Sequence, residues 1–161
     1  MMREYLFRGK RKDNGKWVYG FPYIDRNRNC AITYCEINFQ RISFEVIPET
    51  IGQFIGLCDI NGKKIFEGDI FKFEDEVWQS CYTSCGTEWN SWEVENCGVV
   101  GFNEELSQYD FIKYRFGQNS VEADLHENHD MTFADFITDL EIVGNIYDHP
   151  ELMEDENTNE R

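Results

Sequence analysis

Basic residues are missing from a long central part of this chain. No Lys or Arg occurs between Phe73 and Ile112, and the 161 residues include only 15 basic side chains against 31 acidic ones, for a formal net charge of −16. A summed field of that sign repels phosphate at long range. We therefore expect nucleic acid to be an unlikely partner.

Long apolar runs are also missing. No segment approaches the ~20 apolar residues that a membrane-spanning helix needs. The first residues alternate charged and apolar side chains, unlike the apolar stretch of a secretory signal. We expect no membrane association and a cytoplasmic location, where thiols are kept reduced. The six cysteines, Cys30, Cys35, Cys58, Cys81, Cys85 and Cys97, are therefore expected to be free rather than paired.

Motifs that carry catalysis are absent from the sequence. It has no phosphate-cradling glycine-rich loop, no nucleophile elbow and no His-Glu-x-x-His motif. The side chains with most metal-binding potential are His126 and His129, together with Cys81, Cys85 and Cys97. Their spacing differs from the tight knuckles of structural zinc sites. We expect no cofactor and no catalytic residue, and keep a small metal-dependent enzyme as the weakest alternative.

Short strands separated by Gly, Asn and Asp turns dominate the chain. Asn14-Gly15 and Asn61-Gly62 each predict a tight hairpin. Gly68-Asp69 predicts a bulge or bend at which Asp69 hydrogen-bonds locally rather than acting as a functional carboxylate. Strands that meet at such glycine corners are typical of a small, curved barrel. The pattern thus predicts a mainly all-β fold.

Helical signals are confined to the last quarter of the chain. Spacing of apolar residues between Leu125 and Leu140 allows one short helix, which Thr132 or Asp130 would cap. Pro150 is placed where a final helical turn can begin. Residues 154–161 are acidic and apolar side chains are missing from them, so they are expected to form a disordered tail.

Charge is unevenly distributed along the chain. Residues 1–28 carry a charge of +5, so the remaining 133 residues sum to −21. This segregation predicts that the basic N-terminal hairpin, with Arg11 and Lys12 near its turn, lies against an acidic surface of the same subunit or of a neighbour. The alternative is a nucleic-acid-related role, either direct DNA binding by the hairpin or an acidic face that mimics DNA.

Tryptophans gather in the acidic stretch. Trp78, Trp89 and Trp92 lie within a polar segment at about residues 74–96, which has room for an extra hairpin. Aromatic side chains are enriched at protein interfaces, although these rings have the alternative of folding inward over the mouth of a barrel. The candidate interaction surface therefore comprises Trp78, Trp89 and Trp92 together with Arg11 and Lys12.

Four groups of segments resemble one known family. They are Arg3–Lys10 with Gly15–Gly20, Val46–Phe54, the run Phe54–Phe73, and Ile142–Asp148 with Pro150–Leu152. In order and in content they are similar to the YopX-like proteins of bacteriophages and prophages. The segments are spread over nearly the whole chain, whereas residues 73–96 depart from the family's pattern.

The resemblance implies a fold and an origin but no chemistry. It implies an SH3-like β-barrel over residues 49–153 with an insert at about 74–96, an additional N-terminal β-rich portion over residues 1–48, and at most one or two short helices. No molecular function is established for the family, so no catalytic residue is carried over. We expect a phage- or prophage-derived, non-enzymatic module in the bacterial host cell that self-associates as a homo-oligomer and binds a host or phage protein.

Overall fold

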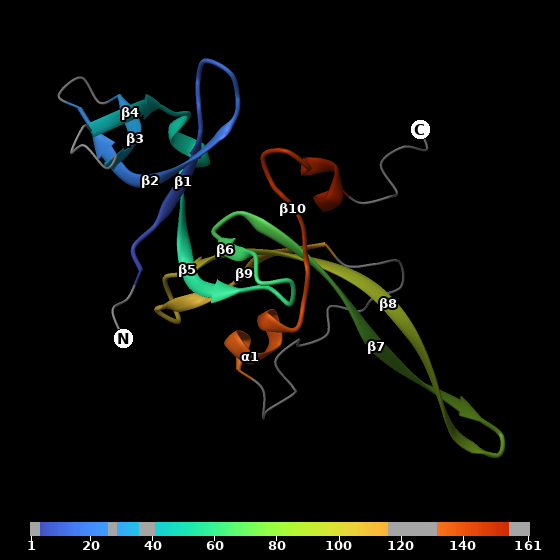
Figure 1. The fold of residues 1–161 in the computed structure, drawn as a ribbon. Helices are drawn as coiled ribbons and strands as arrows, with labels where there is room; N and C mark the ends of the chain where they lie inside the picture. The colour runs from blue at the N-terminus through green and yellow to red at the C-terminus, as the bar shows by residue number, and fades with distance from the viewer. Residues whose placement is uncertain (1–3, 26–28, 36–40, 116–131, 155–161) are drawn as a thin grey trace, which may run out of the picture.

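The computed structural model of the chain describes residues 4–25, 29–35, 41–115 and 132–154. These residues form two antiparallel sheets, with a single α-helix among them (Figure 1). The strands are β1 (Phe7–Lys10), β2 (Trp17–Ile24), β3 (Cys30–Cys35), β4 (Arg41–Glu45), β5 (Gly52–Cys58), β6 (Lys64–Phe66), β7 (Asp69–Thr83), β8 (Gly86–Asn103), β9 (Gln108–Arg115) and β10 (Ile142–Asn145). The first sheet has the order β4-β3-β2-β1-β5-β6, and the second has the order β10-β7-β8-β9. The prediction of a mainly all-β fold is confirmed.

The two predicted Asn-Gly hairpins are present. Gly15 (φ 68°) closes the turn between β1 and β2, and Gly62 (φ 79°) closes the turn between β5 and β6. Both glycines adopt the left-handed conformation that other residues reach only with strain. The second turn is braced by the buried carboxylate of Asp59, which accepts hydrogen bonds from the amides of Asn61 and Lys63.

The acidic stretch forms a two-stranded arm. β7 and β8 pair continuously from Ile70 opposite Val99 to Thr83 opposite Gly86. β10 pairs with β7 only at residues 69–71, and β9 pairs with β8 only at residues 97–103. Residues 73–96, called the arm below, therefore extend beyond both neighbouring strands, as Figure 1 shows. The extra hairpin that the sequence allowed is this arm.

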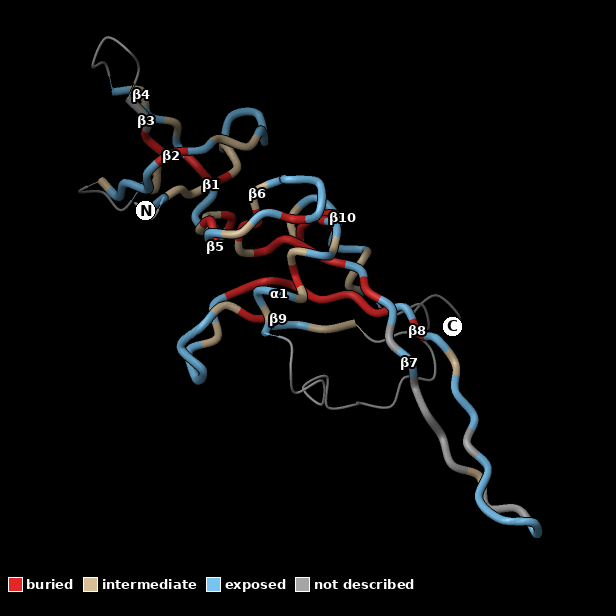
Figure 2. The backbone as a smooth tube through the Cα atoms, turned by 60° about the horizontal axis from the view of Figure 1, so that its bottom comes forward, coloured by how far each residue is buried: buried red, intermediate tan, exposed pale blue. Residues whose placement is uncertain are grey.

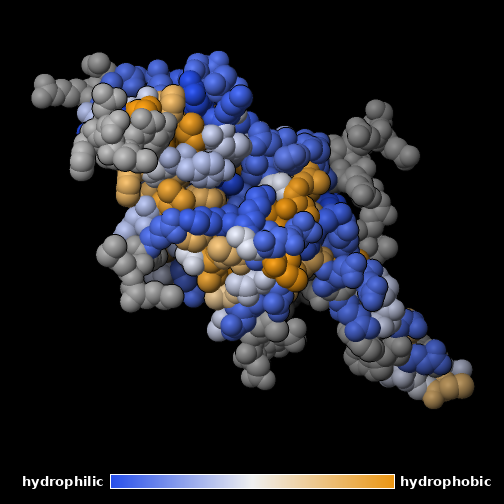
Figure 3. Space-filling view, in the orientation of Figure 1, coloured by the Kyte–Doolittle hydropathy of each residue, from blue (hydrophilic) through white to orange (hydrophobic). Residues whose placement is uncertain are grey.

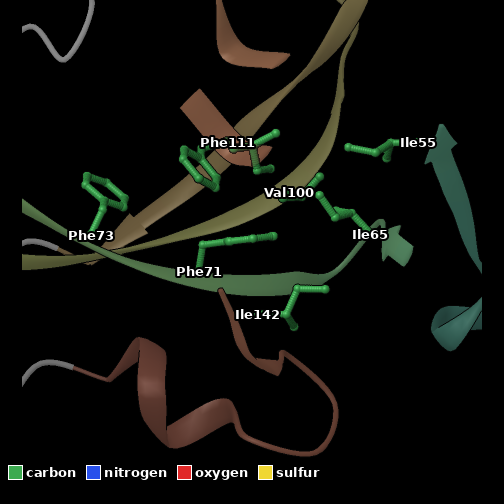
Figure 4. Close-up of a cluster of buried hydrophobic side chains, with 8 residues drawn as sticks. Ile55, Ile65, Phe71, Phe73, Val100, Phe111 and Ile142 are labelled. Carbon is green, nitrogen blue, oxygen red and sulfur yellow. The ribbon is translucent and has the colours of Figure 1, made fainter. Parts of the chain in front are cut away.

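The main core lies between the second sheet and the β5–β6 hairpin. Its buried side chains come from both sheets and from the helix: Ile55, Ile65, Phe71, Phe73, Val100, Phe111, Ile137 and Ile142. Figure 4 shows seven of them together, and Figure 2 shows burial concentrated there, whereas most of the described residues of the arm are exposed. Phe111 stacks on Phe73 with ring centroids 5.5 Å apart. Aromatic packing of this kind adds to the burial of apolar area.

The short helix and the final turn occur where the sequence placed them. Helix α1 (Phe133–Thr138) begins with a capping box between Thr132 and Asp135, so Thr132 is the cap. The 3-10 turn η2 (Pro150–Met153) begins at Pro150 and covers the opposite face of the second sheet. A further 3-10 turn, η1 (Pro48–Thr50), precedes β5. Among the described residues no helix is long and apolar enough to cross a membrane.

The expected barrel is not confirmed. In the part of the chain that the structure describes, neither sheet closes on itself. A single bridge between Arg11 and Val46 brings the end of β4 back beside the end of β1. The six-stranded sheet takes strands from both sides of the expected division at residues 48 and 49, so that division stays a prediction. Of the tail expected at residues 154–161, residues 155–161 lie outside the described residues.

Candidate binding surfaces

One face of the arm carries glutamates directly opposite one another. The register pairs Glu74 with Glu95 and Glu76 with Glu93. Because side chains alternate along a strand, these four positions share one face, and all four residues are exposed. We call them the glutamate face. Like charges opposite each other on a sheet destabilise it, so this arrangement is unfavourable for the arm by itself.

One ion pair lies at the base of the glutamate face. Lys72 lies at the base of the arm, and its ammonium is 2.8 Å from a carboxylate oxygen of Glu95. Lys72 occupies the next position of the same face, since it is two residues before Glu74. The arm beyond it contains no basic residue. Figure 3 shows a predominantly hydrophilic surface over the described part of the arm.

The register distributes the three predicted tryptophans over both faces of the arm. Trp78 pairs with Ser91 and Trp89 pairs with Ser80, which places both on the face of the glutamates. Trp92 pairs with Val77 on the other face. The side chains of Trp78 and Trp89 lie outside the described part of the structure. The indole N–H of Trp92 is shielded from solvent and has no hydrogen-bond acceptor among the described residues.

The predicted basic residues of the N-terminal hairpin are engaged within their own sheet. Arg11 pairs with the carboxylate of Asp13, and its guanidinium lies 4.0 Å from the ring centroid of Phe44. Lys12 pairs with Glu45 at 2.6 Å, and this hydrogen bond raises the pKa of the Lys12 ammonium. The structure thus separates Arg11 and Lys12 from the tryptophans of the arm. Figure 1 shows the β1–β2 hairpin and the tip of the arm at opposite ends of the molecule.

A buried ion pair joins the two sheets. The guanidinium of Arg8 on β1 lies 2.6 Å from the carboxylate of Asp69 on β7, and both side chains are almost fully buried. Arg8 also lies over the rings of Trp17 and Phe66, at 4.6 and 5.0 Å from their centroids. Sequence reasoning did not find this pair.

Asp69 also makes the local hydrogen bond that the Gly-Asp corner predicted. Its second carboxylate oxygen accepts the amide N–H of Phe66 at 2.8 Å. Burial raises the pKa of Asp69, while the Arg8 guanidinium and the Phe66 amide act in the opposite direction. The carboxylate therefore fixes both the corner and the junction between the sheets.

A second polar cluster attaches the C-terminal turn to the N-terminal hairpin. Asp148 pairs with Lys10 and accepts hydrogen bonds from the indole of Trp17 at 2.7 Å and the amide of Asn145 at 2.9 Å. Partial burial acts to raise the pKa of Asp148. The hydrogen bonds from Lys10, Asn145 and Trp17 outweigh that effect and hold the pKa well below its usual range. No sequence motif points to this cluster, because its members are far apart in the chain.

A row of aromatic side chains is exposed on β2. Tyr19, Phe21 and Tyr23 alternate along the strand and therefore share a face, and half or more of each is exposed: 50%, 60% and 51%. At Pro22, β2 lies beyond its last pair with β1 and is hydrogen-bonded only to β3. This agrees with the edge position that a proline in a strand predicts. The sequence analysis did not predict that these aromatic side chains are exposed in a row.

Cys81 on β7 and Cys97 on β8, two of the residues considered for metal binding, lie far apart. Cys97 pairs with Lys72 in the register and Cys81 pairs with Glu88, which places the two cysteines about 30 Å apart along the strands, at ~3.3 Å per residue. No group of potential metal ligands occurs among the described residues. In the part of the chain that the structure describes, Cys30, Cys58, Cys81, Cys85 and Cys97 form no disulfide. His126 and His129 lie outside the described residues.

The family model described as YopX protein matches residues 6–154 of the chain. The match extends through both sheets, the arm and the C-terminal turn. No curated protein matches the chain.

Proposed function

Because the chain belongs to the YopX family, we propose that it acts as the family resemblance suggested, as a phage- or prophage-derived module that binds other proteins in the bacterial cytoplasm. The observation that carries the proposal is the arm. Its two strands extend beyond their neighbours, so each has a long outer edge that no described strand covers. Uncovered strand edges and faces are surfaces on which another chain can dock.

The energetics of the arm support a binding role. A two-stranded hairpin without a covering layer is at best marginally stable in water. The arm also carries opposed glutamates, which lower its stability further. In the described residues no strand pairs with the outer edges of the arm, and a partner would supply a layer that stabilises it.

The polar clusters elsewhere support a non-enzymatic role. Asp59, Asp69 and Asp148 each hold backbone amides or side chains of other elements. Their carboxylates are used to join turns, strands and sheets, and are thus committed to structure. We therefore propose that no reaction is catalysed at these sites.

Site-specific cross-linking inside the bacterium tests the proposal. A photo-cross-linking amino acid at Glu88, exposed near the tip of the arm, is compared with the same group at Glu104, exposed in the turn between β8 and β9. We expect a discrete adduct with one protein from Glu88 and none of that size from Glu104. Equal labelling from the two positions would contradict the proposal.

Self-association is the second part of the proposal. The aromatic row of β2 supports it, because Tyr19, Phe21 and Tyr23 are large side chains of the kind enriched at interfaces. A two-fold contact requires only one such self-complementary patch.

Sedimentation of the purified chain tests self-association. We expect the dimer to dissociate at a higher protein concentration when Phe21 and Tyr23 are both changed to Thr. Thr is chosen because it keeps strand propensity. Ile112→Thr is the matched control, because Ile112 is 57% exposed on β9 and lies outside the row. A monomer at high micromolar concentration in the unmodified chain would end this part of the proposal.

The nucleic-acid alternative is favoured by one observation only, the glutamate face, which suits an acidic mimic of DNA. Direct DNA binding has less support. Four cations of residues 1–28, called the basic segment, already pair with carboxylates: Arg8, Lys10, Arg11 and Lys12. Mimicry predicts that the chain inhibits a DNA-binding protein without shifting DNA itself. A salt-dependent shift of DNA that is lost in the double variant Arg11→Glu, Lys12→Glu would instead favour direct binding.

A further inference from the structure

We propose that two copies of the chain pack sheet against sheet through the aromatic row of β2, with Arg41 of each copy placed against Glu45 of the other. This inference rests on the self-association part of the proposed function and names the symmetry and the charged contacts of that interface. It starts from the face of the first sheet that carries Tyr19, Phe21 and Tyr23, each of which is half or more exposed.

The register extends this face across β3 and β4. Phe21 pairs with Thr33 and Thr33 pairs with Ser43, so their side chains form one line across the sheet. On β4, Arg41 and Glu45 lie two residues before and two residues after Ser43. They therefore share its face at equal distances of about 7 Å on either side of the line, and both are exposed. The face thus has a cation towards one end and an anion towards the other.

This order of charges is self-complementary under a two-fold axis of one direction. An axis in the interface that runs along the line of Phe21, perpendicular to the strands, exchanges the two ends of the face and keeps the strands of both sheets aligned. Arg41 of one copy then meets Glu45 of the other, and symmetry repeats the contact. An axis parallel to the strands would keep the two charges at opposite ends, where they cannot meet.

Glu45 has room for this second cation. Lys12 binds one of its carboxylate oxygens, Oε1, at 2.6 Å, and the side chain of Glu45 is still 52% exposed. A carboxylate accepts several hydrogen bonds through its two oxygens. The guanidinium of Arg41 from the other copy can therefore bind without breaking the pair with Lys12.

The centre of the face suits an apolar cover. The hydroxyls of Thr33 and Ser43 hydrogen-bond each other at 2.9 Å, so covering them leaves neither without a partner. Tyr19 packs on the buried ring of Phe66 with centroids 5.6 Å apart, which holds one end of the row in place. Three half-exposed aromatic side chains offer about 300 Å² per copy. That is more than a third of the ~800 Å² per partner in a standard interface, and the flanking side chains of β4 add to it.

Charge reversal followed by sedimentation tests this orientation. Arg41→Glu and Glu45→Arg each place like charges against each other at both symmetric contacts, so we expect either change to weaken the dimer at least tenfold, about the cost of such a juxtaposition. Mixing the two variants brings opposite charges together again. We therefore expect a heterodimer of about the original affinity, followed through a fluorescent label on one variant.

The matched controls reverse charges on the second sheet. Lys113 on β9 and Glu104 in the turn between β8 and β9 are both exposed. Lys113→Glu and Glu104→Arg should change dimerisation by less than about twofold, because surface charges outside an interface act only through the screened net charge.

Neutral variants keep the test decisive if a charge reversal disrupts folding, which denaturant unfolding of each variant detects. Arg41→Gln and Glu45→Gln should each weaken the dimer by about threefold, and the double variant should lose no more than either alone, because all three remove the same contact. Fully additive losses would contradict the contact.

Failure of this inference is distinguishable from failure of self-association. If the unmodified chain dimerises but the charge reversals behave as their controls do, or if mixing them restores no heterodimer, the orientation is overturned while self-association stands. A monomer at high micromolar concentration would end both.

Discussion

At the scale of single residues, Arg8 and Asp69 are the side chains whose loss should cost most. Removing one partner of a buried ion pair leaves an uncompensated charge and typically costs about 3–5 kcal/mol. We expect Arg8→Met to lower the free energy of unfolding by about that amount, measured by denaturant unfolding. The cost has an upper limit, because burial already favours the protonated form of Asp69.

The control for Arg8 is a surface pair of the same kind. Lys12→Met removes the exposed pair with Glu45 and should have little effect on unfolding. The double variant Arg8→Met, Asp69→Leu should recover part of the loss, since apolar replacement of both partners is often tolerated. Recovery should be incomplete because Asp69 also accepts the amide of Phe66. A loss in Arg8→Met no larger than in Lys12→Met would contradict the role assigned to the pair.

Asp148 predicts a pH dependence of defined sign. Its folded pKa is lowered by its hydrogen bonds, so its stabilising contribution is fully present above the unfolded pKa, about 3.9, and is lost as the pH falls towards the folded pKa. We expect Asp148→Asn to reduce the free energy of unfolding by about 1 kcal/mol at neutral pH, a modest value because the side chain is partly exposed. The difference should shrink as the pH falls below about 4.

Trp17→Phe provides an independent test of that cluster. It removes the indole donor to Asp148 and keeps an aromatic ring beneath Arg8. The pKa of the Asp148 carboxyl, followed by NMR titration, should rise towards its ordinary value. An unchanged pKa would mean that Trp17 does not contribute to the shift.

Residues that act locally could be predicted from the sequence, and those that act across the fold could not. The Gly68-Asp69 corner indicated a local hydrogen bond for Asp69, and the amide of Phe66 supplies it. The pairing with Arg8 depends on how two sheets pack, which no local pattern encodes. Asp148 and Lys10 meet for the same reason.

At the scale of elements, the opposed glutamates of the arm make a prediction of their own. Glu93→Lys turns the pair with Glu76 into one of opposite charges and should stabilise the arm by about 0.2–1 kcal/mol. Amide hydrogen exchange in the arm should slow accordingly. Glu88→Lys changes the net charge equally but faces Cys81, so it should have less effect. Equal effects of the two changes would mean that cross-strand repulsion is unimportant.

The arm shows where the strand pattern fails as a predictor. Its strands turn at Ser84 and Cys85 rather than at an Asn-Gly pair, and most of the described residues of the arm are exposed. Where neither face of a strand packs on a core, the alternation of apolar and polar residues that identifies a strand is not required. The hairpins β1–β2 and β5–β6, which turn at Asn-Gly pairs, occur where the sequence placed them.

At the scale of the whole molecule, the basic and acidic regions of the sequence belong to different sheets. The basic hairpin of the first sheet and the acidic arm of the second lie at opposite ends (Figure 1). The sequence predicted that the basic hairpin lies against an acidic surface of the same subunit or of a neighbour, and the arm was one candidate for that surface. In the described residues the ion pairs of the basic segment go to Asp13, Glu45, Asp69 and Asp148, so its pairing with the arm in the same subunit is not observed.

The fold class could be predicted from the sequence, whereas the arrangement of the strands in two sheets could not. Turn residues and alternating patterns predicted the strands, but the order of the two sheets depends on long-range packing around Phe71, Phe111 and Ile65. A small curved barrel is one way to pack such strands. Here the inner ends of β7 and β8 belong to the second sheet, and their outer ends extend beyond the neighbouring strands.

The most direct test of a binding role for the arm is amide hydrogen exchange of the intact chain, alone and with the protein that cross-links to Glu88. We predict fast exchange in residues 76–93 of the free chain and clear protection of them in the complex, with the amides of β1–β4 unchanged. Protection confined to the sheets, with an arm that exchanges as fast as in the free chain, would contradict that role.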